Sequence, residues 1–150
     1  MRAAIAAVKG AGHGADPVVA LLHAQLAEAE LDAGDAAKAQ ATATKALELA
    51  RAALPTRNIG LANALFALAR AELELEHAAV AEPLLREALA VRGPLASHDP
   101  RVLEVKVALV RAIEARGGVE AAPLRAELEP LLGTSGSLYA ADLRKRLAVR

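Results

Sequence analysis

The chain of 150 residues has no cysteine and no tryptophan, and only one phenylalanine, one tyrosine and one methionine. Without cysteine it has no disulfide, no thiolate ligand for zinc and no cysteine nucleophile. That absence suits a reducing compartment, and we expect a cytoplasmic protein. The apolar runs are shorter than the roughly 20 residues that a membrane-spanning helix needs, so the sequence predicts no membrane partner.

The chain also has no net charge, because eighteen basic residues balance eighteen acidic ones. Nucleic-acid binding draws on clustered lysine and arginine that neutralise phosphates, so a neutral chain predicts no nucleic-acid partner. With 55% apolar residues, the chain does not have the low hydrophobicity of a disordered protein. The length fits one domain of ordinary size.

What the sequence has in abundance is alanine and leucine, with 40 and 25 copies. Both residue types favour helices, whereas the aromatic residues that strands prefer are scarce. Apolar residues recur three or four positions apart, and Asp-Pro, Gly-Asp and Gly-Pro pairs interrupt the pattern. This spacing predicts helices over residues 17–33, 36–53, 57–75, 78–92, 100–116, 119–132 and 138–148.

Three segments of the chain resemble one another at nearly constant spacing. Residues 34–39 (GDAAKA) are followed 42 positions later by residues 76–81 (EHAAVA), and 41 positions further on by residues 117–122 (GGVEAA). The same register aligns Leu26, Leu68 and Leu109, and also Ala29, Ala71 and Ala112. Each unit is therefore expected to be a pair of antiparallel helices joined by a tight turn, within boundaries near 16–57, 58–98 and 99–135. A period of this size is typical of a helical solenoid, in which each unit buries its apolar face against its neighbours.

These residues resemble the tetratricopeptide repeat, with Gly-x-x-x-x-Ala after a leucine and a small residue, over roughly residues 16–132. The period is longer than the usual 34 residues. Together with the loops HGADPVVA and SHDPRVLE and the helix AEPLLREALAV, it resembles the kinesin-light-chain-like subclass common in bacterial multidomain proteins. The resemblance implies an all-α fold, a right-handed α-solenoid of about three antiparallel helix hairpins. The sequence departs from the pattern at Glu129, where the other units have alanine, and in lacking most of the large consensus aromatics.

The two ends of the chain differ in character. Residues 1–15 are either an N-terminal arm or the remnant of a preceding repeat helix, since residues 4–8 resemble the end of the helix predicted over 78–92. Near the other end, Tyr139, Leu143 and Leu147 form a stripe at helical spacing, with basic residues on the other faces. We interpret residues 136–150 as a C-terminal capping helix that covers the last apolar face of the stack. A basic helix on a membrane surface is the less favoured alternative.

A search for chemistry finds no catalytic constellation. The glycines of residues 10–14 are followed by Ala-Asp, whereas a phosphate-binding loop continues with lysine and a hydroxyl residue. The four histidines do not have the spacing of metal ligands. Asp99 before Pro100 is the pattern of a helix cap. The sequence therefore predicts no enzyme activity, no cofactor and no metal.

In repeats of this family the first helices line a concave groove, and the resemblance implies that a peptide or partner protein binds there. Projected through the repeat register, the groove positions are Leu21, Gln25, Glu28, Asp32, Asn63, Phe66, Ala67, Arg70, Glu104, Val107, Ala108 and Arg111. The candidate contact residues among them are Gln25, Glu28, Asn63, Phe66, Arg70 and Arg111. Phe66 is either a ligand anchor or part of the core, and Arg70 is either a ligand contact or a solvated charge. The lysine of the clamp that some members use for acidic C-termini has no counterpart, because Ala24 and Phe66 stand at its position.

The charges of these positions predict a groove with an acidic end at Glu28 and Asp32 and a basic end at Arg70 and Arg111. The favoured function is a protein–protein interaction module with an unidentified protein or peptide partner, and the oligomeric state stays open. Two alternatives are a regulatory tail of a larger bacterial signalling enzyme, such as a serine/threonine kinase, or of a transcriptional regulator, and an unrelated helical enzyme or ligand-binding protein.

The repeat interpretation predicts that one unit does not fold alone, because only its neighbours cover its apolar face. A peptide of residues 56–98 should show little helix by circular dichroism at room temperature, whereas residues 16–150 should melt cooperatively. A cooperative melt of the isolated unit would contradict the solenoid.

Overall fold

The computed structural model describes residues 17–55, 58–93, 95–96, 98–133 and 138–148, together with residues 1, 3, 6 and 7. The expected arm or helix remnant at residues 1–15, with the glycines at 10–14, lies almost wholly outside the described residues. From residue 17 on, the described part of the chain forms seven helices and no strand. They are α2 (Pro17–Asp32), α3 (Ala36–Ala53), α4 (Ile59–Glu74), α5 (Ala78–Arg92), α6 (Pro100–Ala115), α7 (Ala121–Gly133) and α8 (Leu138–Ala148).

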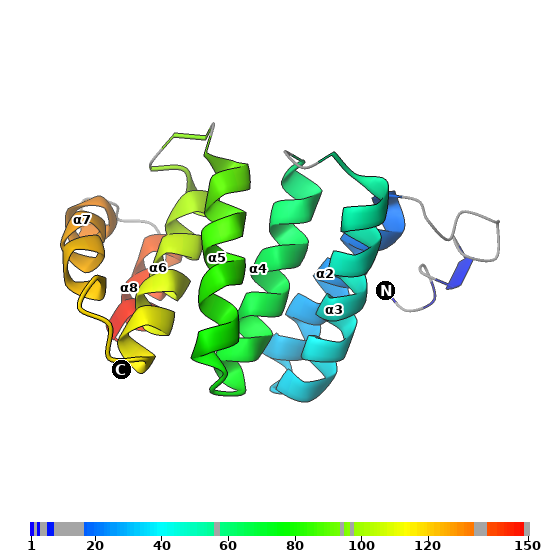
Figure 1. The fold of residues 1–150 in the computed structure, drawn as a ribbon, viewed down its shortest axis with the longest axis horizontal. Helices are drawn as coiled ribbons and strands as arrows, with labels where there is room; N and C mark the ends of the chain where they lie inside the picture. The colour runs from blue at the N-terminus through cyan, green and yellow to red at the C-terminus, as the bar shows by residue number, and fades with distance from the viewer. Residues whose placement is uncertain are drawn as a thin grey trace.

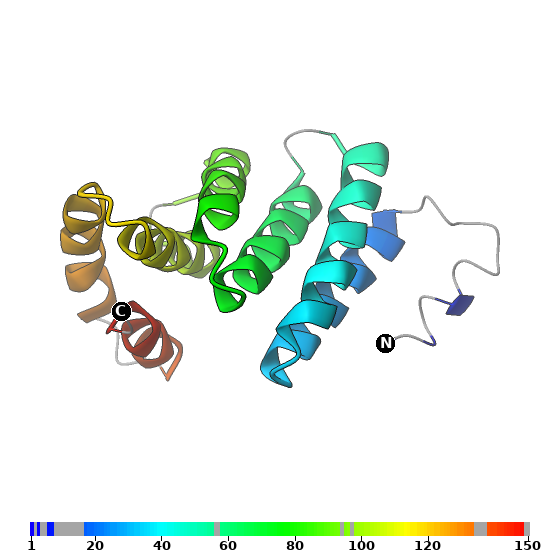
Figure 2. The same cartoon turned by 60° about the horizontal axis from the view of Figure 1, so that its bottom comes forward.

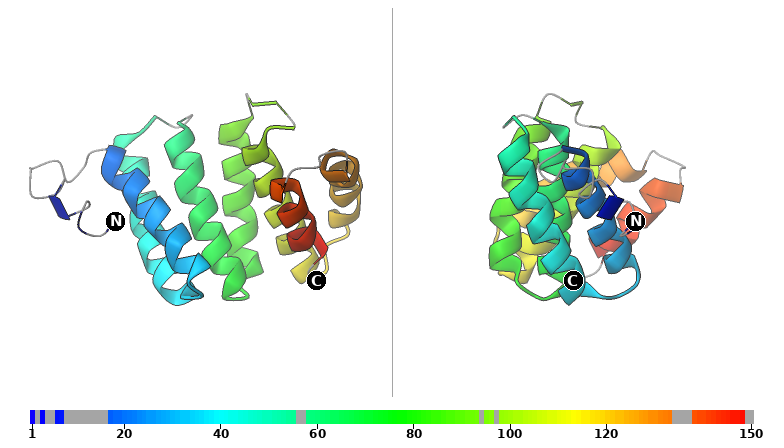
Figure 3. Two further views of the ribbon diagram at one scale, coloured as in Figure 1. Left: turned by 180° about the vertical axis from the view of Figure 1, so that it is seen from behind. Right: turned by 90° about the vertical axis from the view of Figure 1, so that its right-hand side faces the viewer.

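Helices α2 to α7 follow one another across the molecule in chain order, and α8 turns back to lie beside α6, as Figures 1 and 2 show. Consecutive helices pack against each other, α2 also packs against α4, and α8 contacts both α6 and α7. Viewed from behind, α2 and α8 lie nearest the viewer on either side of the middle helices, and the end-on view places both on the same side of the stack (Figure 3). The part of the chain that the structure describes is thus an all-helical solenoid, as the sequence predicts.

Helix boundaries agree with the predicted ranges to within two residues, and α3, α4 and α6 begin at capping side chains. The side chain of Asp35 accepts a hydrogen bond from the Lys38 amide at 3.2 Å. The Asn58 side chain accepts one from the Gly60 amide at 2.7 Å. Asp99 caps α6 through the Arg101 amide at 2.9 Å, with Pro100 as the first helical residue. Each cap satisfies an amide that has no partner inside its own helix.

The three turns between paired helices share one geometry. Gly34, Glu76 and Gly117 occupy equivalent positions with φ of 80°, 63° and 71°. In the first turn the Asp35 amide donates to the Glu30 carbonyl, and the Gly34 amide donates to the Leu31 carbonyl, both at 2.9 Å. The other two turns repeat this pair of bonds at the same offsets. This is the Schellman arrangement, which requires a left-handed residue after the helix; the repeat therefore preserves a backbone conformation even where glycine is replaced by Glu76.

Alanine is the commonest buried residue of the stack. Buried alanines without any exposed surface include Ala27, Ala39, Ala43, Ala46, Ala50, Ala62, Ala64, Ala67, Ala69, Ala71, Ala81, Ala88 and Ala112. Larger buried side chains such as Leu65, Leu85 and Leu128 fill the space between these close contacts. Small residues at these positions let the helix backbones approach closely, so the core runs along the whole stack.

The last helix packs its apolar stripe on unit three. Leu143 and Leu147 are 1% and 4% exposed, and Tyr139 is partly buried against the same core. The Tyr139 hydroxyl donates to the Pro100 carbonyl at 2.9 Å, which fixes α8 near the start of α6.

The turn geometry predicts opposite effects for two substitutions. No atom lies within 4 Å of a Cβ added at Gly34, so Gly34→Ala should cost only its left-handed conformation, about 1 kcal/mol of unfolding free energy. Glu76→Gly should instead stabilise the protein, by less than about 1 kcal/mol, because a more flexible unfolded chain offsets part of the relieved strain. Thermal or denaturant melts measure both, and a stabilising Gly34→Ala would contradict this account of the turn.

The packing of α8 predicts that removing residues 136–150 exposes apolar surface of unit three and promotes self-association. Light scattering measures the association. Leu143→Ala should destabilise the full chain by roughly 2–5 kcal/mol, whereas Lys145→Ala, on an exposed position of the same helix, should change stability little. A truncated chain that stays monomeric and equally stable would make α8 a free tail rather than a cap.

Candidate functional site

A cleft of about 350 Å³ lies on the side of the stack that α2 and α8 share. We call it the α2–α8 cleft. Its described lining residues are Leu21, Ala24, Gln25, Glu28 and Asp32 from α2, Asn63, Phe66 and Arg70 from α4, Arg92 from α5, Arg101 and Glu104 from α6, and Arg146 from α8. Five helices thus contribute to one concave surface, which no single repeat could build.

The apolar part of the α2–α8 cleft centres on Phe66, the only phenylalanine of the chain. Phe66 is 8% exposed and belongs to the continuous core, yet it also lines the cleft. The guanidinium carbon of Arg92 lies 5.4 Å from the ring centroid and that of Arg70 lies 6.0 Å from it. Both distances are within the range of cation–π attraction. Phe66 is therefore part of the core and also lines the cleft, and its role as a ligand anchor stays a prediction.

Arg70 is paired across the cleft rather than solvated. Its guanidinium bonds to the Glu28 carboxylate on α2, and Asp32 Oδ1 lies 3.9 Å from its second terminal nitrogen. Burial raises the pKa of Glu28, and the carboxylates of Glu104 and Asp32 add to that rise, while Arg70 opposes it. Glu28 and Asp32 thus share Arg70 on this wall of the cleft.

Arg92 is the most deeply buried cation of the cleft, with 2% of its surface exposed. It donates to Asn63 Oδ1 at 2.8 Å and to the backbone carbonyl of Arg101. Its Nε has no hydrogen-bond partner in the described part of the chain. Burial lowers the pKa of Arg92 from its usual value, but a guanidinium stays charged at neutral pH.

Two further arginines form the outer rim opposite α2. Arg101 bonds to its own cap residue Asp99 at 2.8 Å, and hydrogen bonding from Arg101 is the main cause that lowers the pKa of Asp99 to about 2. Arg146 bonds to Asp142 at 2.8 Å, one turn earlier on α8. The Arg101 side chain is 51% exposed and the Arg146 side chain 38%. They therefore face solvent at the mouth of the cleft while Arg92 lies beneath.

The structure places most, but not all, of the projected groove positions in this cleft. Leu21, Gln25, Glu28, Asp32, Asn63, Phe66, Arg70 and Glu104 line it, whereas Ala67, Val107, Ala108 and Arg111 do not. Val107 and Ala108 are 2% and 7% exposed, because α8 packs against α6 on this side. The projection treated unit three like the others and did not include this helix.

Arg111 lies elsewhere, and the predicted gradient from Glu28 to Arg111 is wrong. Arg111 contacts the Glu74 carboxylate at 3.4 Å and lines a different cavity of about 860 Å³ beside the turns of units two and three. Glu74 is the repeat equivalent of Asp32, so Arg70 and Arg111 each reach an acid of the preceding unit at the same register. These charges neutralise each other between units instead of separating along the groove.

The repeat register did not indicate that Arg92, Arg101 and Arg146 would line the cleft. Arg92 lies at the end of a second helix, which the register assigns to the opposite face, and Arg101 and Arg146 come from a helix start and from the cap. A signal existed for Arg92, since it ends an otherwise apolar run, AVR, before Gly93. Nothing in the sequence indicated that Arg146 would reach the cleft.

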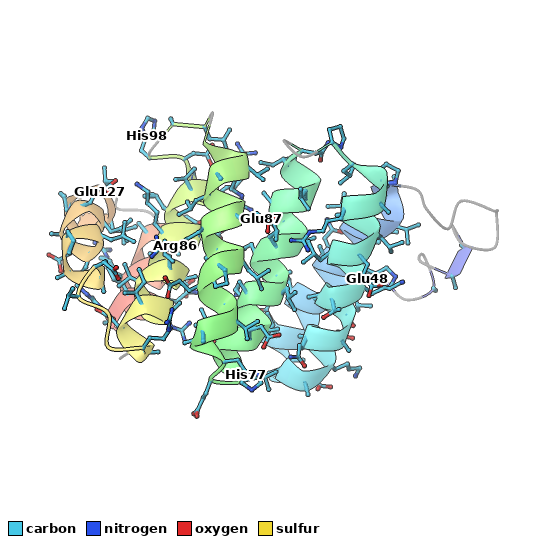
Figure 4. All side chains as sticks on the ribbon, in the orientation of Figure 1. Glu48, His77, Arg86, Glu87, His98 and Glu127 are labelled. Carbon is cyan, nitrogen blue, oxygen red and sulfur yellow. The ribbon has the colours of Figure 1, made fainter. Side chains whose placement is uncertain are left out.

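The face opposite the cleft is charged and largely paired. Figure 4 shows Glu48 on α3, Arg86 and Glu87 on α5, and Glu127 on α7 on this face. Arg86 bonds to Glu82 at 2.8 Å, and Glu87 bonds to Arg51 at 2.8 Å. The larger cavity beside the turns likewise holds charges that already have partners, such as Glu114 with Arg125 at 2.8 Å.

The described residues offer neither a metal site nor a membrane span. They contain no cluster of three or more side chains that could hold a metal ion. Each helix between residues 17 and 148, as far as the structure describes them, is too short or too polar to cross a lipid bilayer.

Comparison with known proteins finds one family. A family model of the tetratricopeptide repeat matches residues 18–92, half of the chain, which covers the helices α2 to α5. The match includes the α2 and α4 walls of the cleft and Arg92. No curated protein matches the sequence.

Proposed function

The chain belongs to the tetratricopeptide repeat family, and from that membership we propose that the α2–α8 cleft binds a short peptide segment or a helix of a partner protein. Tetratricopeptide repeats are generally protein–protein interaction modules. The observation that carries the proposal is the cleft itself, which combines an aromatic wall, a volume of about 350 Å³ and convergent polar groups. Clefts of roughly 300–1,000 Å³ with a few placed polar groups are typical binding sites.

Gln25 and Asn63 support a role in holding a peptide backbone. Gln25 is exposed at the cleft and has no hydrogen-bond partner among the residues that the structure describes. An amide side chain both donates and accepts, so it can pair with a backbone amide and carbonyl at once. Phe66 with its two arginines supplies a surface for an apolar or aromatic side chain of the ligand.

The family is typically a non-catalytic scaffold, and we propose that this chain is one as well. Its arginines in the cleft are all bonded to other side chains of the protein, and the described lining contains no serine, threonine or cysteine that could serve as a nucleophile. A regulatory unit of a larger bacterial signalling enzyme or transcriptional regulator would use the same cleft, and that context, like cytoplasmic location, stays a prediction.

The proposal predicts that filling the cleft abolishes peptide binding. Peptides are selected from a phage-displayed random library on the full chain, and their dissociation constants are measured by fluorescence anisotropy. Gln25→Trp should weaken binding by about tenfold or more, because the indole occupies ligand space at an exposed position where it does not disturb the core.

The matched control is Glu48→Trp, at another exposed helical position, on the opposite face (Figure 4). It should leave the dissociation constant unchanged, and both variants should melt like the parent chain. Equal weakening by the two substitutions, or none by Gln25→Trp, would move the binding site away from the α2–α8 cleft.

A further inference from the structure

Arg92 differs from every other arginine that lines the α2–α8 cleft in the kind of partner it has. Arg70 bonds to Glu28, Arg101 to Asp99, and Arg146 to Asp142. The partners of Arg92 are an amide oxygen and a backbone carbonyl, both uncharged. No carboxylate of the described residues lies within 4.0 Å of its guanidinium.

Such an arrangement is costly for the folded protein. A cation that is 2% exposed has lost most of its hydration, and neutral acceptors compensate this loss less well than a carboxylate does. The unpartnered Nε adds a buried donor without an acceptor. A leucine or methionine would fill the same space without either penalty.

The acids that face Arg92 do not supply the missing charge. Glu104 on α6 is the acid that acts on it most strongly, but it lies beyond ion-pair distance and interacts with the Tyr139 hydroxyl of α8. Asp99, the next acid, is held by Arg101. Glu28 and Asp32 are on the far wall, where they share Arg70.

We infer that the bound segment itself brings the counter-charge, a carboxylate that docks against Arg92 from the cleft, with Arg101 and Arg146 at the rim. This inference rests on the proposed function and specifies its ligand as an acidic peptide. The exposed rim arginines attract the acid first, and Arg92 then binds it where water is excluded. The terminal nitrogen of Arg92 that now donates to Asn63 would donate to the peptide carboxylate instead. The Asn63 amide is then free to bond to the peptide.

The first test uses the unmodified protein and the selected peptides described above. We expect glutamate or aspartate to be enriched at one position of the peptides, and a synthetic peptide with that acid replaced by its amide to bind about tenfold more weakly or worse. Peptides with free and with amidated C-termini distinguish a side-chain carboxylate from a terminal one. An amide peptide that binds as well as the acid overturns the inference.

The second test removes the cation. Arg92→Gln should weaken binding of the acidic peptide by about tenfold or more but leave binding of its amide counterpart unchanged. Arg86→Gln is the matched control on the same helix, on the face shown in Figure 4, and should alter neither. If Arg92→Gln does not fold, Arg101→Gln and Arg146→Gln replace exposed side chains and should each weaken only the acidic peptide.

The outcomes separate this inference from the proposed function. Peptides that Gln25→Trp blocks, but that show no preference for an acid, would leave the cleft as the binding site and overturn the role of Arg92. Peptides insensitive to Gln25→Trp would overturn both.

Discussion

Close packing of alanine is the constraint on which the rest of the structure depends. An alanine side chain contributes only about 0.8 kcal/mol when its methyl group is buried, so a helix rich in alanine gains stability only where its backbone approaches neighbours on more than one side. The fully buried rows Ala39–Ala43–Ala46–Ala50 and Ala62–Ala64–Ala67–Ala69–Ala71 meet this condition between consecutive helices. Each pair of helices is therefore stable through its neighbours, and the tight Schellman turns hold the pairs at the short separation that alanine requires.

The same constraint explains how much of the fold could be predicted from the sequence. Helix ends follow local rules, because Asp35, Asn58 and Asp99 cap helices through atoms only two or three residues away. The repeat period then fixes which helices pair. The position of α8 does not follow from either rule, since its apolar stripe predicts that it is buried but not that it lies over α6 on the cleft side.

The candidate site, too, is predictable only where the repeat register applies. The register projected Glu28, Asn63, Phe66 and Arg70 onto one surface, and all four line the cleft because they are on first helices, whose faces repeat. It assigned Arg111 to the same surface and overlooked Arg92, because side-chain reach and the end of a neighbouring helix are tertiary properties without a periodic signal. The inter-unit pairs Arg70–Asp32 and Arg111–Glu74 show the consequence. Equivalent residues repeat a contact between units, and a repeated contact uses up charge that would otherwise face a ligand.

Arg92 is informative because it does not take part in this pairing of charges. Along the described stack, most arginines at exposed or half-buried positions pair with acids of the same or an adjacent unit, as Arg51 does with Glu87 and Arg125 with Glu114. The exposed Arg144 bonds to the Leu132 carbonyl instead. Local self-consistency of this kind is expected of a sequence that only has to fold. A buried guanidinium held by neutral groups next to the single phenylalanine departs from it, at the place where five helices converge on a cleft. Departures from local consistency concentrate at functional sites, so this buried cation without a counter-charge is the residue whose chemistry says most about the ligand.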